Sequence, residues 1–256
     1  PLNYAQSSAG GWYSGADTLD NTDSDTITAA EFEWKQIHEP ISITRRDELS
    51  NSGQAAKVNF VKSKMKIAEK SIKDKVAVGL WNNGTTSKAI LGVRSFLSTS
   101  NSYGNISQTS ASWWQANVDA ATTTQTIGAV QALHSAAGLN GDSVTVILSG
   151  STRYDSYYLQ LQPQQRFTDA KTASGGFTAL MFNGVPWIVD SKAPSTHVVG
   201  LNEDALHFIV HQDEDFRMEP FAKPINQNVQ VAHIYAMLAF ASDNNRTHFA
   251  LTALTA

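Results

Sequence analysis

Three side chains that can bind metals, His207, His211 and Asp213, lie within a span of seven residues. Two histidines four residues apart could share a zinc ion on a helix. However, apolar residues alternate between positions 206 and 210, which predicts a strand. Positions four apart on a strand are separated by ~13 Å, too far to bind one ion. We therefore expect ordinary histidines on a half-exposed strand and no metal site.

A serine nucleophile is the second chemistry to consider. Ser149 follows an apolar, strand-like run and precedes an expected helix, as a hydrolase nucleophile would. Its neighbours are Leu148 and Gly150, so the flanking glycines of a nucleophile elbow are missing, and no histidine or aspartate partner is indicated. The triplet Gly141-Asp142-Ser143 resembles a lipase motif, but such triplets arise by chance in turns. A soluble hydrolase remains only the weakest alternative.

Other catalytic and cofactor signals are also missing. Asp20, Asp23 and Asp25 are spaced like part of a calcium loop, without the glycine and final glutamate of an EF-hand. The chain has no cysteine, which excludes disulfides, thiolate metal sites and cysteine nucleophiles. No phosphate-binding glycine loop or dinucleotide fingerprint is present. We expect no catalytic residue, no metal and no cofactor, and hence no enzyme.

Composition indicates a folded protein. Only 16% of the 256 residues are charged while 41% are hydrophobic, a balance that disordered chains do not have. The net charge of −4 gives no general reason to bind nucleic acid or an anionic membrane. No apolar run approaches the ~18 residues of a membrane-spanning helix, and no signal peptide is visible. Because the first residue is Pro1 rather than Met, we expect a processed chain or a missing N-terminal portion.

Residues 26–80 are the most informative stretch, since a long extended segment runs directly into a long helix. In residues 26–46, Phe32 and Trp34 share one face, and the isoleucines that follow share the other. The apolar face changes near Gln36, which predicts either a bulge or a strand with different neighbours at its two ends. Neither element has obvious partners nearby, so we expect burial against other copies of the chain.

The helix is expected over residues 54–80 and would be about 40 Å long at ~1.5 Å per residue. Its apolar residues form one narrow stripe, consisting of Val58, Val61, Met65, Ala68, Ile72 and Val76. A second stripe beside it is basic and consists of Lys62, Lys66, Lys70 and Lys73. This basic stripe is either a solvated face, a genome-facing surface or a contact with an acidic neighbour.

The rest of the chain predicts an α/β lobe followed mainly by strands. We expect a helix over residues 127–137 ended by Gly138, a buried strand over 144–148, and a helix whose capping box is Thr152 with Asp155. Asn183-Gly184 predicts a two-residue hairpin turn. Residues 229–240 are apolar on both faces and predict a buried central strand. The pair Trp113-Trp114 is more typical of a core or interface anchor than of base or sugar stacking.

An ordered series of short motifs resembles the major capsid proteins of tailed double-stranded DNA bacteriophages, which have the Hong Kong 97-type fold. The resemblance covers nearly the whole chain, although no single motif is specific. Asn105, where such proteins often have a second glycine, and Ser107-Gln108, in place of an acidic–basic pair, depart from the pattern. The series comprises residues 30–37, Asn51-Ser52-Gly53, the long helix, Gly92-Val93-Arg94, Tyr103-Gly104-Asn105-Ile106, Trp113-Trp114, Gly200-Leu201-Asn202 and Asn244-Asn245-Arg246.

The resemblance implies an α+β fold with four parts. Residues 1–46 would form an extended loop reaching over a neighbouring subunit, and residues 47–80 a spine helix. Residues 81–121 and 204–256 would form the peripheral domain. Residues 122–203 would form the axial domain, whose tips meet around the five-fold and six-fold axes. The usual N-terminal arm would be short or absent.

The resemblance also implies a structural role and specific partners. Copies of the chain would assemble into pentamers and hexamers of an icosahedral head enclosing double-stranded DNA, bound without sequence specificity. The protein would be located in the virion capsid, assembled in the host cytoplasm, with scaffold, portal and decoration proteins as further partners and no membrane. The alternative is an encapsulin-like compartment shell. The residues expected at contacts between subunits are Trp12, Phe32, Trp34, Lys35, Arg45 and Arg46.

Some phages with this fold crosslink their shells through a lysine–asparagine isopeptide bond promoted by a glutamate. Lys35 lies in the expected loop. No asparagine and glutamate matching that chemistry can be identified in the sequence, so we expect a shell without covalent crosslinks.

Overall fold

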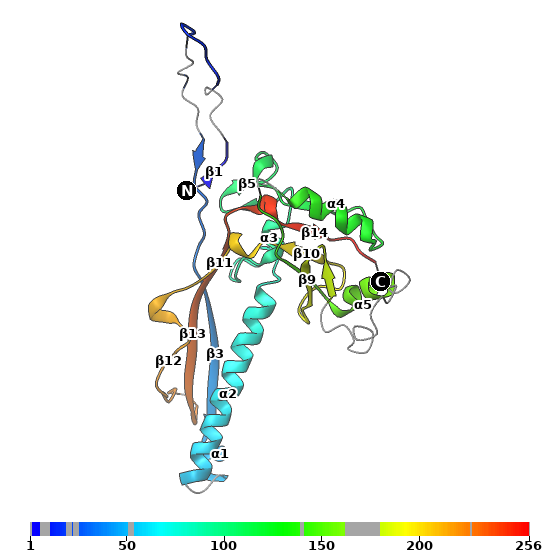
Figure 1. Cartoon of the computed structure of the whole chain (residues 1–256). Coiled ribbons are helices and arrows are strands. Elements are labelled where there is room, and N and C mark those ends of the chain that lie inside the picture. Colours follow the sequence, from blue (N-terminus) through cyan, green and yellow to red (C-terminus); the bar gives the residue numbers. More distant parts are fainter. Residues whose placement is uncertain are drawn as a thin grey trace.

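A computed structural model describes residues 2–5, 11–18, 22, 26–50, 54–138, 141–161, 180–225 and 227–255. Figure 1 shows an elongated part built from the helix α2 and the strands β3 and β13. A compact lobe carrying the helices α4 and α5 lies to one side of it, and an N-terminal hairpin projects from the end opposite α1. The mixed helix and sheet architecture agrees with the expected α+β class.

The elongated part is organised around two long antiparallel strands. β3 (Lys35–Thr44) pairs with β13 (Val229–Ser242) in one uninterrupted register, from Lys35 opposite Leu238 to Thr44 opposite Val229. The bulge predicted near Gln36 is therefore wrong. The apolar face changes because Phe32 and Trp34 precede β3, in a segment without regular structure. β3 is thus part of a sheet, whereas the expected layout placed it in the extended loop.

The predicted long helix is present as α2 (Gln54–Gly79). Ala68 and Ile72 are buried in one core cluster with Ile41 of β3 and Ile234 of β13, so the apolar stripe covers one face of the sheet. A short helix, α1 (Arg45–Ser50), connects β3 to this region. The expected spine over residues 47–80 therefore begins with a separate helix.

β13 is central, as predicted. β3 occupies one of its edges, while β11 (Leu206–Val210) and β12 (Arg217–Met218) pair with it along the other. Short 3₁₀ turns, η3 (Glu203–Ala205) and η4 (Gln212–Glu214), flank β11. The strand predicted from the alternation of residues 206–210 is confirmed.

The compact lobe contains a six-stranded sheet in the order β6-β14-β10-β7-β9-β8. α4 (Ile127–Ala137) and α5 (Ser151–Leu161) share its apolar core, which contains Val130, Tyr157 and Trp187. β6 and β14 come from segments expected in the peripheral domain, so this lobe exceeds residues 122–203. The strands are β6 (Asn117–Asp119), β14 (Phe249–Leu251), β10 (Val198–Leu201), β7 (Val146–Ser149), β9 (Val185–Val189) and β8 (Leu180–Phe182).

Local capping and turn signals are partly confirmed. The side chain of Thr126 accepts the Ala129 N–H and caps α4. Asn183 and Gly184 have φ values of 50° and 83°, as the two central residues of a type I′ hairpin turn require. The predicted capping box of Thr152 is wrong, because α5 already begins at Ser151.

The N-terminal segment forms a separate projection. β1 (Leu2–Asn3) pairs with β2 (Ile27–Thr28), and residues 11–18 lie toward the far end of this hairpin (Figure 1). Near its base, α3 (Val93–Phe96), η1 (Ser112–Trp114) and the small hairpin of β4 (Ser102–Tyr103) and β5 (Ile106–Ser107) complete the junction with the compact lobe. No described helix has both the length and the apolarity needed to cross a bilayer.

Candidate functional site

Ser149 is not placed as a nucleophile. Its side chain is fully buried at the end of β7. Its Oγ accepts a hydrogen bond from Trp187 Nε1–H at 2.7 Å and donates one to the Gly150 carbonyl at 3.2 Å. A nucleophile needs an exposed oxygen with a base within reach. Ser149 instead holds the indole of Trp187 in place, so a hydrolase centred on it has no support.

The histidines of the β11 region make separate local contacts. His207 Nε2 lies 3.0 Å from the Asp243 carboxylate, and His211 Nδ1 accepts the Asp213 N–H at 3.2 Å. These are local contacts on an exposed strand and at a turn, as expected. Among the described residues, no three histidine, cysteine or acidic side chains gather to hold an ion. Asp20, Asp23 and Asp25 lie outside the described residues.

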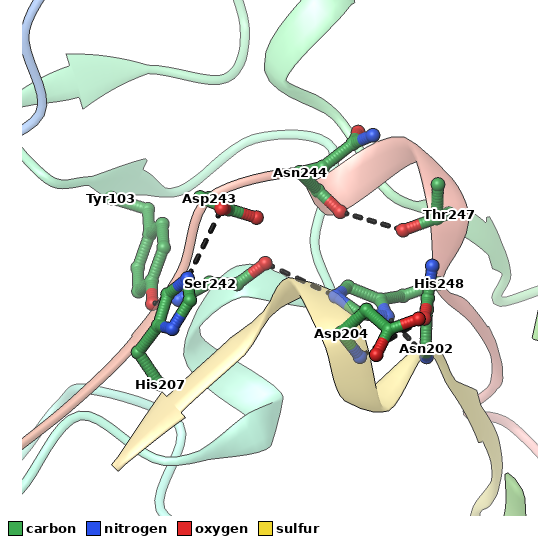
Figure 2. A network of polar contacts seen from close by, with 9 residues as sticks. All are labelled: Tyr103, Asn202, Asp204, His207, Ser242, Asp243, Asn244, Thr247 and His248. Carbon is green, nitrogen blue, oxygen red and sulfur yellow. Dashed lines mark hydrogen bonds and ion pairs between the residues drawn. The ribbon is translucent and has the colours of Figure 1, made fainter. Parts of the chain in front are cut away.

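The structure reveals a serine–histidine pair that the sequence does not suggest. Ser242 Oγ lies 3.0 Å from His248 Nε2, and both side chains are buried (Figure 2). His248 Nδ1 accepts the Asn202 N–H at 3.0 Å, so the ring proton of the neutral imidazole is on Nε2. Nε2 therefore donates to Ser242 and cannot accept its proton, which is the opposite of what a catalytic dyad requires.

Burial keeps this imidazole neutral. Desolvation lowers the pKa of His248 to about 3, since no carboxylate compensates the buried charge. On the other side of the network, the Tyr103 hydroxyl accepts the Ser242 N–H at 2.8 Å, and burial raises the pKa of Tyr103. The network connects Ser242 of β13 and Tyr103 of β4 with His248, just before β14, and Asn202, just after β10. Its role is structural, and only the fold brings its members together.

The tryptophan pair has a core role in part. Trp114 is buried, and its Nε1–H donates to the Tyr103 carbonyl at 3.0 Å. Trp113 is half-buried, and its ring stacks on Tyr4 of the N-terminal segment with centroids 4.9 Å apart. The pair thus packs against the base of the N-terminal hairpin, where Trp113 stacks on Tyr4.

The residues expected at contacts between subunits lie in different parts of the molecule. Trp12 is fully exposed near the end of the hairpin. Trp34 is 41% exposed, with its ring edge against His211. Phe32 is half-buried and packs on Tyr103 of the same chain, with 4.9 Å between ring centroids. Of these three aromatic residues, Trp12 and Trp34 are the more exposed.

The three basic residues of the same set also differ from one another. Lys35 Nζ donates to Glu33 Oε2 and to the Ser87 carbonyl, both at 2.9 Å, and is half-buried. This ammonium group is therefore bound to two groups of its own chain. Arg45 and Arg46 are exposed on α1, at the end of the molecule opposite the hairpin (Figure 1). Arg45 and Arg46 therefore belong to a different surface of the subunit from Trp12.

The basic stripe of α2 faces away from the sheet. Lys62, Lys66, Lys70 and Lys73 are all exposed. None of the four ammonium groups forms an ion pair or hydrogen bond with a residue that the structure describes. By contrast, Lys75 on the same helix pairs with Glu39 of β3. The stripe is therefore a basic surface available for a partner.

Comparisons of the whole fold give close structural matches. A chain from "Cyanophage A-1(L) capsid asymmetric unit" superposes with a TM-score of 0.74 at 15% identity, covering 100% of this chain and 87% of that one. "Capsid of native GTA particle computed with C5 symmetry" gives 0.69 at 13% identity, covering 99% and 84%. The holo-SrpI encapsulin complex from Synechococcus elongatus PCC 7942 gives 0.59 at 10% identity, covering 86% and 74%.

Comparisons of the sequence alone find nothing: no model of a known protein family and no curated protein matches the chain. The resemblance is therefore carried by the fold. Because the superpositions extend over nearly the complete chain, the protein has the Hong Kong 97-type fold, as predicted.

Proposed function

We propose that this chain is the major capsid protein of a tailed double-stranded DNA bacteriophage, which self-assembles into pentamers and hexamers of an icosahedral head. The observation that carries the proposal is the full-length match to a phage capsid subunit, with a TM-score of 0.74. The proposed role is structural rather than enzymatic. It agrees with the two serines being buried and with the histidine donating a hydrogen bond to one of them instead of accepting its proton.

The N-terminal hairpin gives independent support. Trp12 and Tyr13 are 107% and 69% exposed, respectively, so the part of the hairpin that the structure describes presents two aromatic rings that its own chain does not bury. Aromatic side chains are favoured anchors at protein interfaces. A projecting segment of this kind gains its burial from another molecule, and in a shell that molecule is the neighbouring subunit. Many such contacts, each weak, stabilise a closed lattice together.

The expected four-part layout is retained as a proposal with changed boundaries. The extended loop ends before β3, and the axial lobe also takes in β6 and β14. We infer that the tips of this lobe meet around the five-fold and six-fold axes. The shell would enclose double-stranded DNA, bound without sequence specificity, and would be part of the virion. Assembly in the host cytoplasm with scaffold, portal and decoration proteins completes the proposal.

An encapsulin-like compartment is the second candidate, favoured by the match to the holo-SrpI encapsulin complex with a TM-score of 0.59. The phage proposal is preferred because the capsid matches cover more of both chains and superpose more closely. The two candidates differ in what the shell contains, namely a DNA genome or protein cargo.

Electron microscopy and sedimentation velocity of the purified protein, with and without its scaffold, test the proposal. Closed shells or capsomer rings are the expected result. Particles from infected or expressing cells are then treated with nuclease, and their protected DNA and protein cargo are measured. Protected DNA supports the phage head, whereas an enzyme cargo supports the compartment. A monomer that persists with scaffold and the full-length chain contradicts both.

A further inference from the structure

The outward face of α2 carries more than lysines. Ile67 is 63% exposed and lies on the same outward half of the helix as Lys66 and Lys70. An exposed isoleucine beside unpaired ammonium groups is suited to a protein partner, which buries the apolar side chain and pairs the charges. We call this face the basic face; it consists of Lys62, Lys66, Ile67, Lys70 and Lys73.

A second surface has the opposite character. Asp213 and Asp215 are exposed in the turn between β11 and β12, and their carboxylates have no ion pair with any described residue. Phe216 follows them, is 38% exposed and has a φ of 48°. A bulky residue with positive φ is strained, and such strain persists where a side chain is held for a function. Asp213, Asp215 and Phe216 form the acidic knob.

The charge of the two regions is complementary. α2 contains seven of the nineteen lysine and arginine residues, with only Glu69 and Asp74 in opposition. The segment from Glu203 to Glu219 contains six carboxylates and a single arginine. Both carry an aromatic or aliphatic side chain within the charged surface. The two surfaces therefore carry opposite charges, and each includes an apolar side chain that the other can cover.

The two surfaces lie on opposite sides of the sheet. α2 packs over the sheet next to β3 with its basic face turned outward, whereas β12 pairs with the edge of β13 opposite β3. Figure 1 shows the same separation, with the β12 segment and α2 on either side of the β3–β13 pair. They cannot meet within one chain. A head-to-tail contact between two copies brings them together, and head-to-tail contacts generate rings.

We propose that the acidic knob of one subunit docks on the basic face of the next, with Phe216 packed beside Ile67 and the two aspartates against Lys66 and Lys70. This contact sets the direction of the ring, because opposite charges are presented on its two sides. The inference rests on the proposed shell function and names the surfaces that join neighbours within a ring. It assigns the basic face to protein rather than to the genome.

The test uses two charge-reversed variants of the complete chain. Lys66→Glu/Lys70→Glu makes the basic face acidic, and Asp213→Lys/Asp215→Lys makes the knob basic. In each variant alone, like charges face one another at every contact. We therefore expect the association of subunits to weaken by about tenfold or more, as measured by sedimentation velocity. The four substitutions combined in one chain restore opposite charges, and we expect assembly to return.

A mixture of the two charge-reversed variants gives a sharper result. Each contact is complementary only if the variants alternate around the ring, and strict alternation closes only in rings with an even number of subunits. We therefore expect the mixture to form six-membered rings, flat sheets or tubes, without five-membered rings or closed icosahedral shells. Negative-stain images distinguish these products.

Two further variants complete the test. Lys88→Glu reverses an exposed lysine that has no described partner and lies outside α2, and it should assemble as the wild type does. Phe216→Asn removes the aromatic ring and introduces a residue that tolerates the positive φ of this position. It should weaken assembly without lowering the stability of the monomer.

The outcomes separate this inference from the proposed function. Shells of both charge-reversed variants that match the wild type would refute the docking contact and leave the capsid role intact. Normal shells of Lys66→Glu/Lys70→Glu that retain less DNA would show that the basic face contacts the genome, and would also refute it. A wild-type protein that never assembles with its scaffold would remove the capsid role itself.

Discussion

Trp81 Nε1–H donates a hydrogen bond to Asp190 Oδ2 at 2.7 Å. Trp81 is the buried residue just after α2, and Asp190 follows β9 in the six-stranded sheet. A second contact lies beside it, because Lys192 Nζ is 2.6 Å from Asp74 of α2. These two contacts attach the long helix to the compact lobe, so they help to fix the orientation of one lobe against the other.

Trp81→Phe should destabilise the protein by about 1–3 kcal/mol, because it removes the N–H donor and leaves the Asp190 oxygen without a partner. Urea unfolding followed by circular dichroism measures this change. The matched control is Asp74→Asn, which breaks a more exposed ion pair and should cost less than about 1 kcal/mol. Equal losses of unfolding free energy in the two variants would show that the Trp81–Asp190 hydrogen bond stabilises the protein no more than the exposed ion pair does.

Gly92→Ala should destabilise the protein by about 2–3 kcal/mol through overpacking. A Cβ at this position would lie 2.5 Å from the Leu80 carbonyl oxygen and from the Asn82 nitrogen, and backbone atoms cannot easily move away. Gly128→Ala is the control, since a Cβ there meets nothing within 4 Å. It lies inside α4 and should stabilise the helix by up to about 1 kcal/mol. Thermal unfolding of both variants should show shifts of opposite sign.

The buried His248 should make the protein sensitive to acid. Its pKa is about 3 in the folded protein and near 6.5 in an unfolded chain, so the unfolded state binds more protons between these values. Its stability contribution is complete above pH ~6.5 and is lost as the pH falls toward about 3, a loss on the order of 5 kcal/mol.

Urea titrations at several pH values measure this loss. His248→Gln should be less stable at neutral pH but should lose stability less steeply on acidification. Part of the slope should remain, because burial and the nearby Arg94 lower the pKa of His197 to about 4. Identical slopes for the variant and the wild type would contradict the assignment.

Neither Ser149 nor Ser242 should react as a hydrolase nucleophile. A fluorophosphonate probe labels serines that a neighbouring base activates, whereas Ser149 is buried against Trp187 and Ser242 accepts its hydrogen bond from His248. Mass spectrometry of the folded protein after treatment should find neither residue modified. Labelling that is abolished by Ser149→Ala would revive the hydrolase alternative.

Trp12→Ala should separate folding from assembly. The side chain is fully exposed and contributes no buried area to its own subunit, so the unfolding midpoint should change little. Assembly should weaken, because an exposed aromatic residue on a projecting hairpin is a typical interface anchor. Tyr13→Ala, at the less exposed neighbouring ring, is the comparison. Wild-type assembly of Trp12→Ala would remove this residue from the subunit contacts.

Elements with a strong local signal could be predicted from the sequence. The apolar stripe of α2, the Asn183-Gly184 turn and the alternation in β11 are confirmed, because each depends on residues close together in the chain. The start of α5 was predicted wrongly. Thr152 resembled an N-cap, but α5 begins one residue earlier, after Gly150.

The sequence by itself determined the elements, the expected fold family and the absence of cysteine chemistry. Tertiary structure alone decided that β3 joins a sheet with β13, that β6 and β14 extend the compact lobe, and that His248 meets Ser242 and Asn202. Periodicity reports which face of an element is buried, but not which distant segment buries it. The Ser242–His248 pair could therefore be recognised, and its hydrogen-bond direction assigned, only in the fold.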